Sequence, residues 1–445
     1  MFARICLILQ LLVAMSAWAQ VDMNVIEPGT DTPDQAQMLT PPPVSGDAYP
    51  AMIGSEARSN YLRTGWTITT AYSDNVLGEV GANPISDISY SLWPSIAIDK
   101  ATSRLHLMLI YSPGFTIYQH TSGLNQTDQN VASNFQYRLS PHVTASFRES
   151  FLKSSNVFNQ PDPLSAVVVS GSAQPSSVAV VVASANQLSN MTNAELTYQF
   201  SRNGMIGTAG AFTSLHYLNP TEVTGLYNSN SGGGTAFYNY RLSERHYVGA
   251  SYQYSRILTY PQNAQIETQT NYVLGFYTIY LKPTFSVSMS AGPEQVRIFQ
   301  PPSLAYRSWS PALTASTSWQ GRHTNVAASY GRIITSGGGL VGAYLSNNAS
   351  ASARWQVAHT WTLGATAAYA INKNVTPSFF QGTPGGHTVS GTIAVQHPIS
   401  ERFNLEMGYT YLHQSYSDIA VISNAPNINR VFVSVNYQLA RPLGR

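Results

Sequence analysis

The sequence RFNLEMGYTYL, at residues 402–412, contains the pattern on which the fold depends. Apolar side chains occupy every second position, and most residues between them are polar or glycine. The apolar set is Phe403, Leu405, Met407, Tyr409 and Tyr411. An alternation with a period of two predicts a β-strand with one apolar and one polar face. The apolar face would cover a protein core in a soluble sandwich, but would face lipid in a membrane barrel.

The same alternation recurs along the chain, and no long helical pattern interrupts it. Clear examples are residues 66–72, 88–98, 105–117, 248–254, 361–369 and 431–439. Short links between these segments, such as SPH at 140–142 and SER at 243–245, alternate with long polar links, such as 219–231 and 372–386. Bacterial outer-membrane barrels have this order, with short turns in the periplasm and long loops outside.

Eight short and nine long links predict the size of the barrel. We predict an all-β chain that forms a transmembrane, antiparallel, up-and-down β-barrel of outer-membrane type, with about 18 strands and a range of about 16 to 18. An open sheet of this size would exceed the usual limit of about 10 strands, and closure removes its edges. Pro94, Pro113 and Pro311 lie within expected strands, where the missing N–H groups predict β-bulges.

The first residues, MFARICLILQLLVAMSAWAQ, combine a basic start, an apolar run and the small-residue pattern Ala17-Trp18-Ala19. This order predicts a secretory signal peptide over residues 1–19. A retained membrane helix is the alternative, but the run is shorter than the roughly 18 to 20 residues that a helix needs to cross. Residues 20–59 are rich in Pro and polar residues, which predicts a flexible periplasmic leader. The barrel is then expected over residues 60–440.

The composition excludes several classes of protein. Charged residues make up 10% of the chain, against about 25% in typical soluble domains. The net charge of +2, without clustered basic residues, argues against a nucleic-acid partner. The only cysteine, Cys6, lies in the expected signal peptide, so the mature chain would have no disulfide, structural zinc or thiol nucleophile. We expect no cofactor and no metal.

The opening of the expected barrel resembles a known group of proteins. The segments AYSDNVLG at 71–78, ISYSLWPSIAI at 88–98 and LHLMLIYSPGFTIY at 105–118 resemble the β-barrel porin families of bacterial outer membranes, and most closely those associated with exopolysaccharide export. The rest of the chain matches these families only in pattern. The resemblance implies the outer membrane of a Gram-negative bacterium and a link to exopolysaccharide export. It implies no catalytic residue.

The polar parity of the strands places a few charged side chains toward the interior. These pore-lining candidates are Arg138, Arg148, Arg241, Arg354, Glu195 and Glu406. A ring of Arg residues at a constriction would favour anions. The plainer expectation, which we adopt, is that each Arg pairs with an acidic residue or a Tyr on a neighbouring strand.

The longest link, residues 153–191, contains two Val-rich runs, at 166–169 and 178–182. A link this apolar should not extend into water without a partner. We expect it to fold into the interior and narrow the channel. Two strands extended above the membrane, and a contact between protomers, are the alternatives.

Three functions from different classes are compatible with the sequence. The first is a passive channel for small hydrophilic solutes or polysaccharide, with outer-membrane lipid and lipopolysaccharide around it and with periplasmic export machinery as a partner. The second is a structural or docking barrel with a plugged lumen. The third is an outer-membrane hydrolase, but the sequence contains no Gly-x-Ser-x-Gly or HExxH motif. We therefore expect no enzyme activity, and the oligomeric state stays open.

Overall fold

The computed structural model describes the strands and many of the links. The described residues are 60–78, 84–154, 186–219, 225–261, 265–282, 284–300, 306–335, 340, 342–358, 360–375, 385–417 and 427–442. The expected signal peptide and leader, and the Val-rich runs of the longest link, lie outside these ranges. None of the helical structure within them is long and apolar enough to cross a membrane.

Nearly every described segment is a β-strand. The strands are β1 (Asn60–Ser73), β2 (Asp87–Ala101), β3 (Leu105–Tyr118), β4 (Gln126–Arg138), β5 (Val143–Ser154), β6 (Gln187–Gln199), β7 (Gly204–Tyr217), β8 (Ser229–Arg241), β9 (His246–Thr259), β10 (Ile266–Lys282), β11 (Phe285–Phe299), β12 (Tyr306–Gln320), β13 (Thr324–Thr335), β14 (Tyr344–Gln356), β15 (Thr362–Asn374), β16 (Gly386–Pro398), β17 (Phe403–Tyr416) and β18 (Asn427–Pro442). A single 3-10 turn, η1 (Ser122–Leu124), precedes β4.

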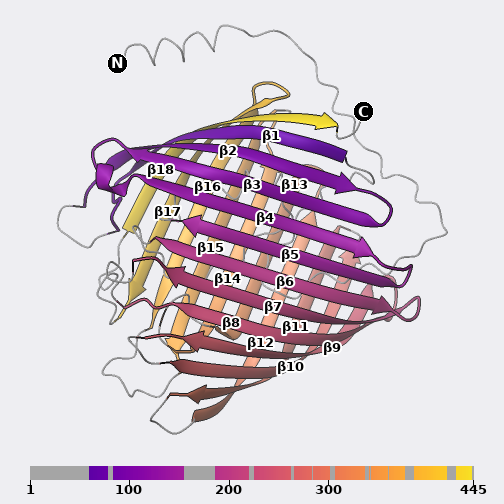
Figure 1. Ribbon diagram of the computed structural model, residues 1–445. Helices are drawn as coiled ribbons and strands as arrows, with labels where there is room; N and C mark the ends of the chain where they lie inside the picture. Colours follow the sequence, from indigo (N-terminus) through magenta and orange to yellow (C-terminus); the bar gives the residue numbers. More distant parts are fainter. Residues whose placement is uncertain are drawn as a thin grey trace. The chain divides into compact units, whose positions relative to one another are not determined.

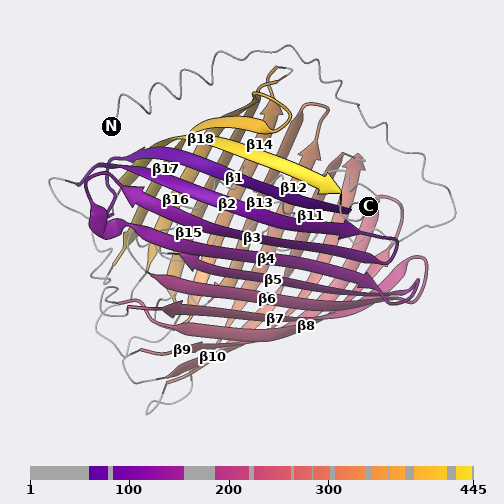
Figure 2. The ribbon, with the colours of Figure 1, turned by 45° about the horizontal axis from the view of Figure 1, so that its top comes forward.

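The strands form one closed antiparallel sheet of 18 strands. Each strand pairs with its neighbour in the sequence, and β1 also pairs with β18 from Tyr61↔Pro442 to Ser73↔Arg430. Figure 1 shows β1 to β10 as the near wall, with the orange strands of the far wall running behind them in a different direction. In Figure 2 the yellow end of β18 lies beside indigo β1, where the barrel closes. The predicted 18-stranded barrel is confirmed.

Short and long links alternate around the barrel, as the sequence predicts. Short links connect β2 to β3, β4 to β5, β6 to β7, β8 to β9, β10 to β11, β12 to β13, β14 to β15 and β16 to β17. All eight lie together at one end, here called the short-link end, and the other end is the long-link end. β5 continues to Ser154 and β6 begins at Gln187, so the longest link is shorter than the expected 153–191.

Serine hydroxyls shape several of the short links. Ser140 Oγ accepts a hydrogen bond from the Val143 amide at 3.0 Å, and Ser400 Oγ accepts one from the Phe403 amide at 3.2 Å. A serine at the first position of a turn satisfies amides that the strands leave unpaired. The sequences SPH and SER therefore favour tight turns at these positions.

The prolines do not produce the expected bulges. Pairing between β2 and β3 stops after Leu92↔Phe115 and resumes at Ile96↔Tyr111 in the same register. The Ser112 hydroxyl donates to the Pro94 carbonyl at 3.0 Å, which replaces part of the lost ladder. Pro311 lies opposite Pro293, again without a shift. The prediction of bulges was wrong because the β2–β3 ladder is interrupted where Pro94 lies opposite Pro113, and the β12–β13 ladder ends before Pro311, in both cases without an extra residue.

The ladder between β12 and β13 is incomplete. It runs from Gln320↔Asn325 only as far as Leu313↔Arg332, so the long-link ends of the two strands do not pair. Ile334, near the end of β13, instead packs with Ile266, Val296 and Ile298 of β10 and β11. These three side chains are on the inward parity of their strands, so the end of β13 lies against the inner face of β10 and β11.

Candidate functional site

The outer face of the barrel is apolar and exposed along the described strands. Large apolar side chains on one parity are about half exposed, including Val431 at 53%, Met289 at 53% and Phe212 at 46%. In RFNLEMGYTYL, Met407 and Tyr409 are exposed on this face, whereas Glu406 is buried on the other. An apolar surface that encircles a closed sheet needs an apolar solvent.

The inner face is rich in hydroxyl groups that pair across strands. Thr278 and Ser288 have hydroxyl oxygens 2.6 Å apart, and those of Ser290 and Thr314 are 2.8 Å apart. Equivalent pairs are Thr69–Ser434, Ser91–Thr116, Ser255–Thr270, Ser286–Ser318, Ser329–Ser350 and Thr392–Thr410. The polar parity therefore forms hydrogen-bonded hydroxyl pairs across seven of the strand pairs on the inner face.

Three of the predicted Arg residues lie on this inner face toward the short-link end. Arg138 and Arg241 are the last residues of β4 and β8, and Arg354 lies two residues before the end of β14. A fourth, Arg63 on β1, was missed by the sequence reasoning, although the parity of Trp66 and Ile68 gives its direction. Its Nη2 atom lies 3.2 Å from Asp99 Oδ2.

Of the expected partners, an acid or a Tyr on a neighbouring strand, the described residues place a Tyr beside Arg241 but give these Arg residues no ion pair with an acid. Within the part of the chain that the structure describes, Arg138, Arg148, Arg241 and Arg354 form no ion pair. Arg241 instead lies over the Tyr247 ring, 6.0 Å from its centroid, and its Nε donates to the Ser243 carbonyl at 3.3 Å.

Arg148 and Glu195 lie farther from the short-link end, on the inner face of the adjacent strands β5 and β6. Arg148 is directly opposite Asn193, and Glu195 is opposite Ser146, so the two charges are diagonal neighbours within electrostatic reach. Arg148 is exposed, as is Gln136 on β4. This part of the wall is the most open to solvent among the predicted positions.

Glu406 differs from the prediction in its exposure. It is on the inward parity, but only 4% of its surface is exposed. Its register partners are Gln396 on β16 and Ser434 on β18, which are also buried. The parity of the strand gave the correct face for Glu406. Packing against the neighbouring inward side chains removes Glu406 from solvent.

A second buried carboxylate, Glu294 on β11, was not anticipated. It accepts hydrogen bonds from the Ser310 hydroxyl at 3.4 Å and from the Ile334 amide at 3.2 Å. The sequence signal that could have pointed to an irregular site here was Pro293, next to Glu294, together with Pro311, its register partner on β12. The carboxylate supports the wall where the β12–β13 ladder ends, and its complete burial excludes contact with a solute.

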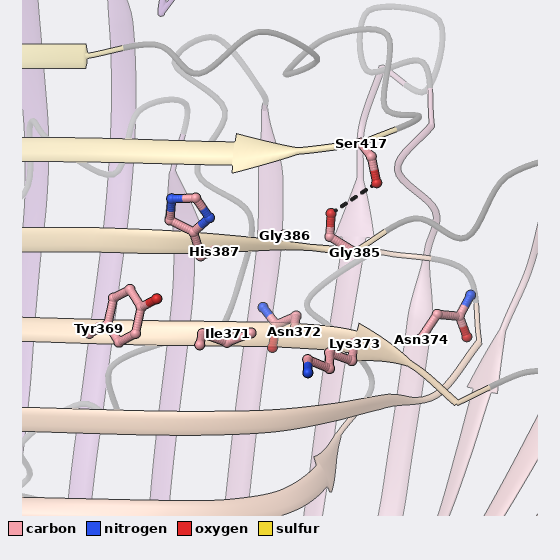
Figure 3. A pocket seen from close by; sticks show the side chains of 9 residues that line it. All are labelled: Tyr369, Ile371, Asn372, Lys373, Asn374, Gly385, Gly386, His387 and Ser417. Atoms are coloured by element: carbon pink, nitrogen blue, oxygen red, sulfur yellow. Dashed lines mark hydrogen bonds between the residues drawn. The ribbon is translucent and has the colours of Figure 1, made fainter.

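The long-link end of β15 and β16 contains a shallow hollow of about 460 Å³. Figure 3 shows Tyr369, Asn372 and Lys373 on one strand, His387 on the next, and Ser417 donating a hydrogen bond to the Gly385 carbonyl. On the inner side of β15, Asn372 Nδ2 donates to the hydroxyl of Tyr416 on β17 at 2.9 Å. The hollow is open, and its lining contains no arrangement typical of a catalytic site.

Comparisons with known proteins give structural likeness only. No protein-family model matches the sequence, and no curated protein matches it either. Among solved structures, OccAB4 of Acinetobacter baumannii is similar, with 8% identity over 87% of this chain and 100% of that chain, at a TM-score of 0.44. OpdQ of Pseudomonas aeruginosa has 9% identity over 86% and 99% of the two chains, at a TM-score of 0.43. The siderophore receptor PirA of Pseudomonas aeruginosa has 11% identity over 86% and 80%, at a TM-score of 0.42.

Proposed function

We propose that the chain is a bacterial outer-membrane protein that acts as a passive channel for small hydrophilic solutes. The observation that carries this proposal is the contrast between the two faces of a closed sheet. Exposed apolar side chains such as Val431 encircle the outside, and paired hydroxyls such as Thr278 and Ser288 line the inside. Lipid outside and water inside satisfy both faces at once.

The link pattern gives the orientation in the membrane. Short links connect the strands in the periplasm and long links lie outside in barrels of this type. With 18 strands, both ends of the barrel domain lie at the short-link end, since β1 begins there and β18 ends there. The Arg-bearing end of the interior then opens toward the periplasm.

A barrel of this size has room for a solute path. At about 16 to 18 strands the interior is too wide for side chains to fill, and an aqueous channel results. Exposed inward side chains such as Gln136, Arg148 and Ala211 are consistent with such a path. Passage of polysaccharide during export would be a narrower role, and its support is the sequence resemblance over residues 71–118.

A plugged barrel with a structural or docking role is the second candidate. Inward side chains near the long-link end are almost completely buried, including Tyr118 at 5% and Tyr416 at 1%, as is Trp93 at 1% in the middle of β2. This burial favours a narrow outer end. Whether a conducting path remains is the property that separates the two candidates.

The deciding experiment is conductance in planar lipid bilayers. The purified protein should first show heat-modifiable migration, in which boiled and unboiled samples of a folded barrel run at different positions on a gel. A channel gives stepwise increases in current and lets small sugars enter liposomes. A folded preparation that produces neither current nor sugar uptake would contradict the channel and favour the plugged barrel.

A further inference from the structure

Positive charge is concentrated at the short-link end of the molecule. The short links and the strand ends beside them carry Arg104, Arg202, Arg245, Lys282, Arg322 and Arg402. The acidic residues described there are Asp99, Glu244, Glu401 and, three residues into β17, Glu406. Since the whole chain has a net charge of only +2, this end is far more basic than the composition suggests.

The cations on the inner face are different residues from the cations in the links. Arg63, Arg138, Arg241 and Arg354 are on the inner face of β1, β4, β8 and β14, and so belong to four separate parts of the wall. Only Arg63 among them has an acidic partner in the described residues, through Asp99. The described inward acids toward this end besides Asp99 are the buried Glu406 and Glu195, which lies beside Arg148, so Arg138, Arg241 and Arg354 leave an excess of positive charge inside the barrel.

The sign of the interior charge changes along the barrel. Toward the long-link end, the described inward charges include the acids Asp87, Asp128 and Glu294 and the cation Arg430, and Arg332 lies close enough to Glu294 to act on its charge. Asp87 is held by amide and hydroxyl groups of His120 and Thr121, and Glu294 by the Ile334 amide. These acids are held within the wall, whereas, among the described residues, Arg138 and Arg354 form no ion pair and Arg241 contacts only the Ser243 carbonyl and the Tyr247 ring.

We propose that the short-link end of the interior is an anion-gathering vestibule, which concentrates small solutes bearing carboxylate or phosphate groups from the periplasm. This inference rests on the proposed channel function and names its preferred substrate class. A cleft with low-dielectric walls and charge of one sign focuses the field and raises the local concentration of counter-ions. Arginine suits both anions because its planar group matches their oxygen atoms.

Phospholipid headgroups are a competing explanation for the basic end. They fit Lys100 and Arg441, which are on the lipid-facing parity of β2 and β18, and the cations in the links. They do not fit Arg138, Arg241 and Arg354, because the wall separates these side chains from lipid. The inward and the link cations can therefore be tested separately.

The ion selectivity of the full-length protein in a lipid bilayer tests whether the inward Arg residues attract anions. One variant combines Arg138→Gln, Arg241→Gln and Arg354→Gln, and a matched control combines Arg202→Gln, Arg322→Gln and Arg402→Gln in the links. Reversal potentials in a KCl gradient should show preference for chloride in the wild type. The inward variant should lower the chloride-to-potassium permeability ratio by about tenfold, the lower range for a focused field, while the control keeps most of it. Currents without chloride preference, or equal loss in both variants, would overturn the proposal.

A second measurement does not depend on conduction. In a Cys6→Ser background, Gln136→Cys places a single thiol on the exposed inner wall, two residues from Arg138. Its rates of reaction with negatively and positively charged methanethiosulfonates are compared in the folded protein in detergent. The negative reagent should react faster, and the inward triple variant should reduce the ratio of rates by about tenfold. An unchanged ratio would overturn the vestibule even if the barrel conducts, whereas absent conductance with a changed ratio would overturn only the channel.

Discussion

The carboxylate of Glu294 on β11 accepts a hydrogen bond from the amide of Ile334 on β13, across the strand that lies between them. This contact is possible because the β12–β13 ladder ends at Leu313↔Arg332. Pro311, two residues beyond Leu313, has no amide hydrogen to continue the ladder. The Glu294 side chain therefore supplies an acceptor that the neighbouring backbone does not.

Removal of this acceptor should destabilise the barrel. In Glu294→Leu the buried Ile334 amide loses its partner, and we expect a loss of about 1 to 3 kcal/mol in the free energy of unfolding. Glu294→Gln keeps a carbonyl oxygen at the same position and should cost much less. The measurement is the urea concentration at which the folded form disappears on gels. Equal midpoints for the Leu and Gln variants would show that the hydrogen bond contributes nothing.

The architecture could be predicted from sequence because its signals are local. The alternation in RFNLEMGYTYL requires only neighbouring residues, and serines such as Ser140 and Ser400 mark short links directly. Since each strand pairs with the next in sequence, the order of links was enough to give the closed sheet. The same parity placed Arg138 and Arg241 on the inner face.

The details of the interior depended on contacts between distant residues and were not predictable. Parity gives the face of Glu406 but not its burial beside Gln396 and Ser434. The role of Glu294 depends on a residue 40 positions away on a strand that is not its neighbour. Arg138 likewise lies opposite Thr144 on β5, five residues from Glu149 on that strand, and this pairing is known only from the register of the sheet.

An Arg substitution should impair folding on the outer face of β7 but not on its inner face. Phe212 is exposed on the outer face near the middle of β7, and Ala211 is exposed on the inner face beside it. Phe212→Arg should cost about 2 to 4 kcal/mol because it places a cation near the membrane midplane. Ala211→Arg should fold normally, because its side chain meets water. Folding yields in lipid vesicles measure the difference, and poorer folding of Ala211→Arg would mean that the faces are reversed.

Closure between β1 and β18 includes a buried hydroxyl pair. Thr69 Oγ1 and Ser434 Oγ are 2.7 Å apart, in residues that are register partners. We expect Thr69→Val and Ser434→Ala to be coupled by about 0.5 to 1.5 kcal/mol, the usual net contribution of a hydrogen bond. A double-mutant cycle on the free energy of unfolding measures this coupling. Additive effects of the two substitutions would show that the strands close without help from this pair.

Gly114 on β3 should not tolerate a methyl group, because the buried Trp93 ring covers it. A β-carbon at Gly114 would lie 2.5 to 2.7 Å from three atoms of that ring, and Trp93 is 1% exposed. Gly114→Ala should therefore cost about 1 to 3 kcal/mol, as overpacking does in other buried sites. Gly275→Ala on β10 is the matched control, since a β-carbon there has no atom within 4 Å. Urea unfolding followed by tryptophan fluorescence compares the two variants, and equal stabilities would mean that Trp93 moves freely away from Gly114.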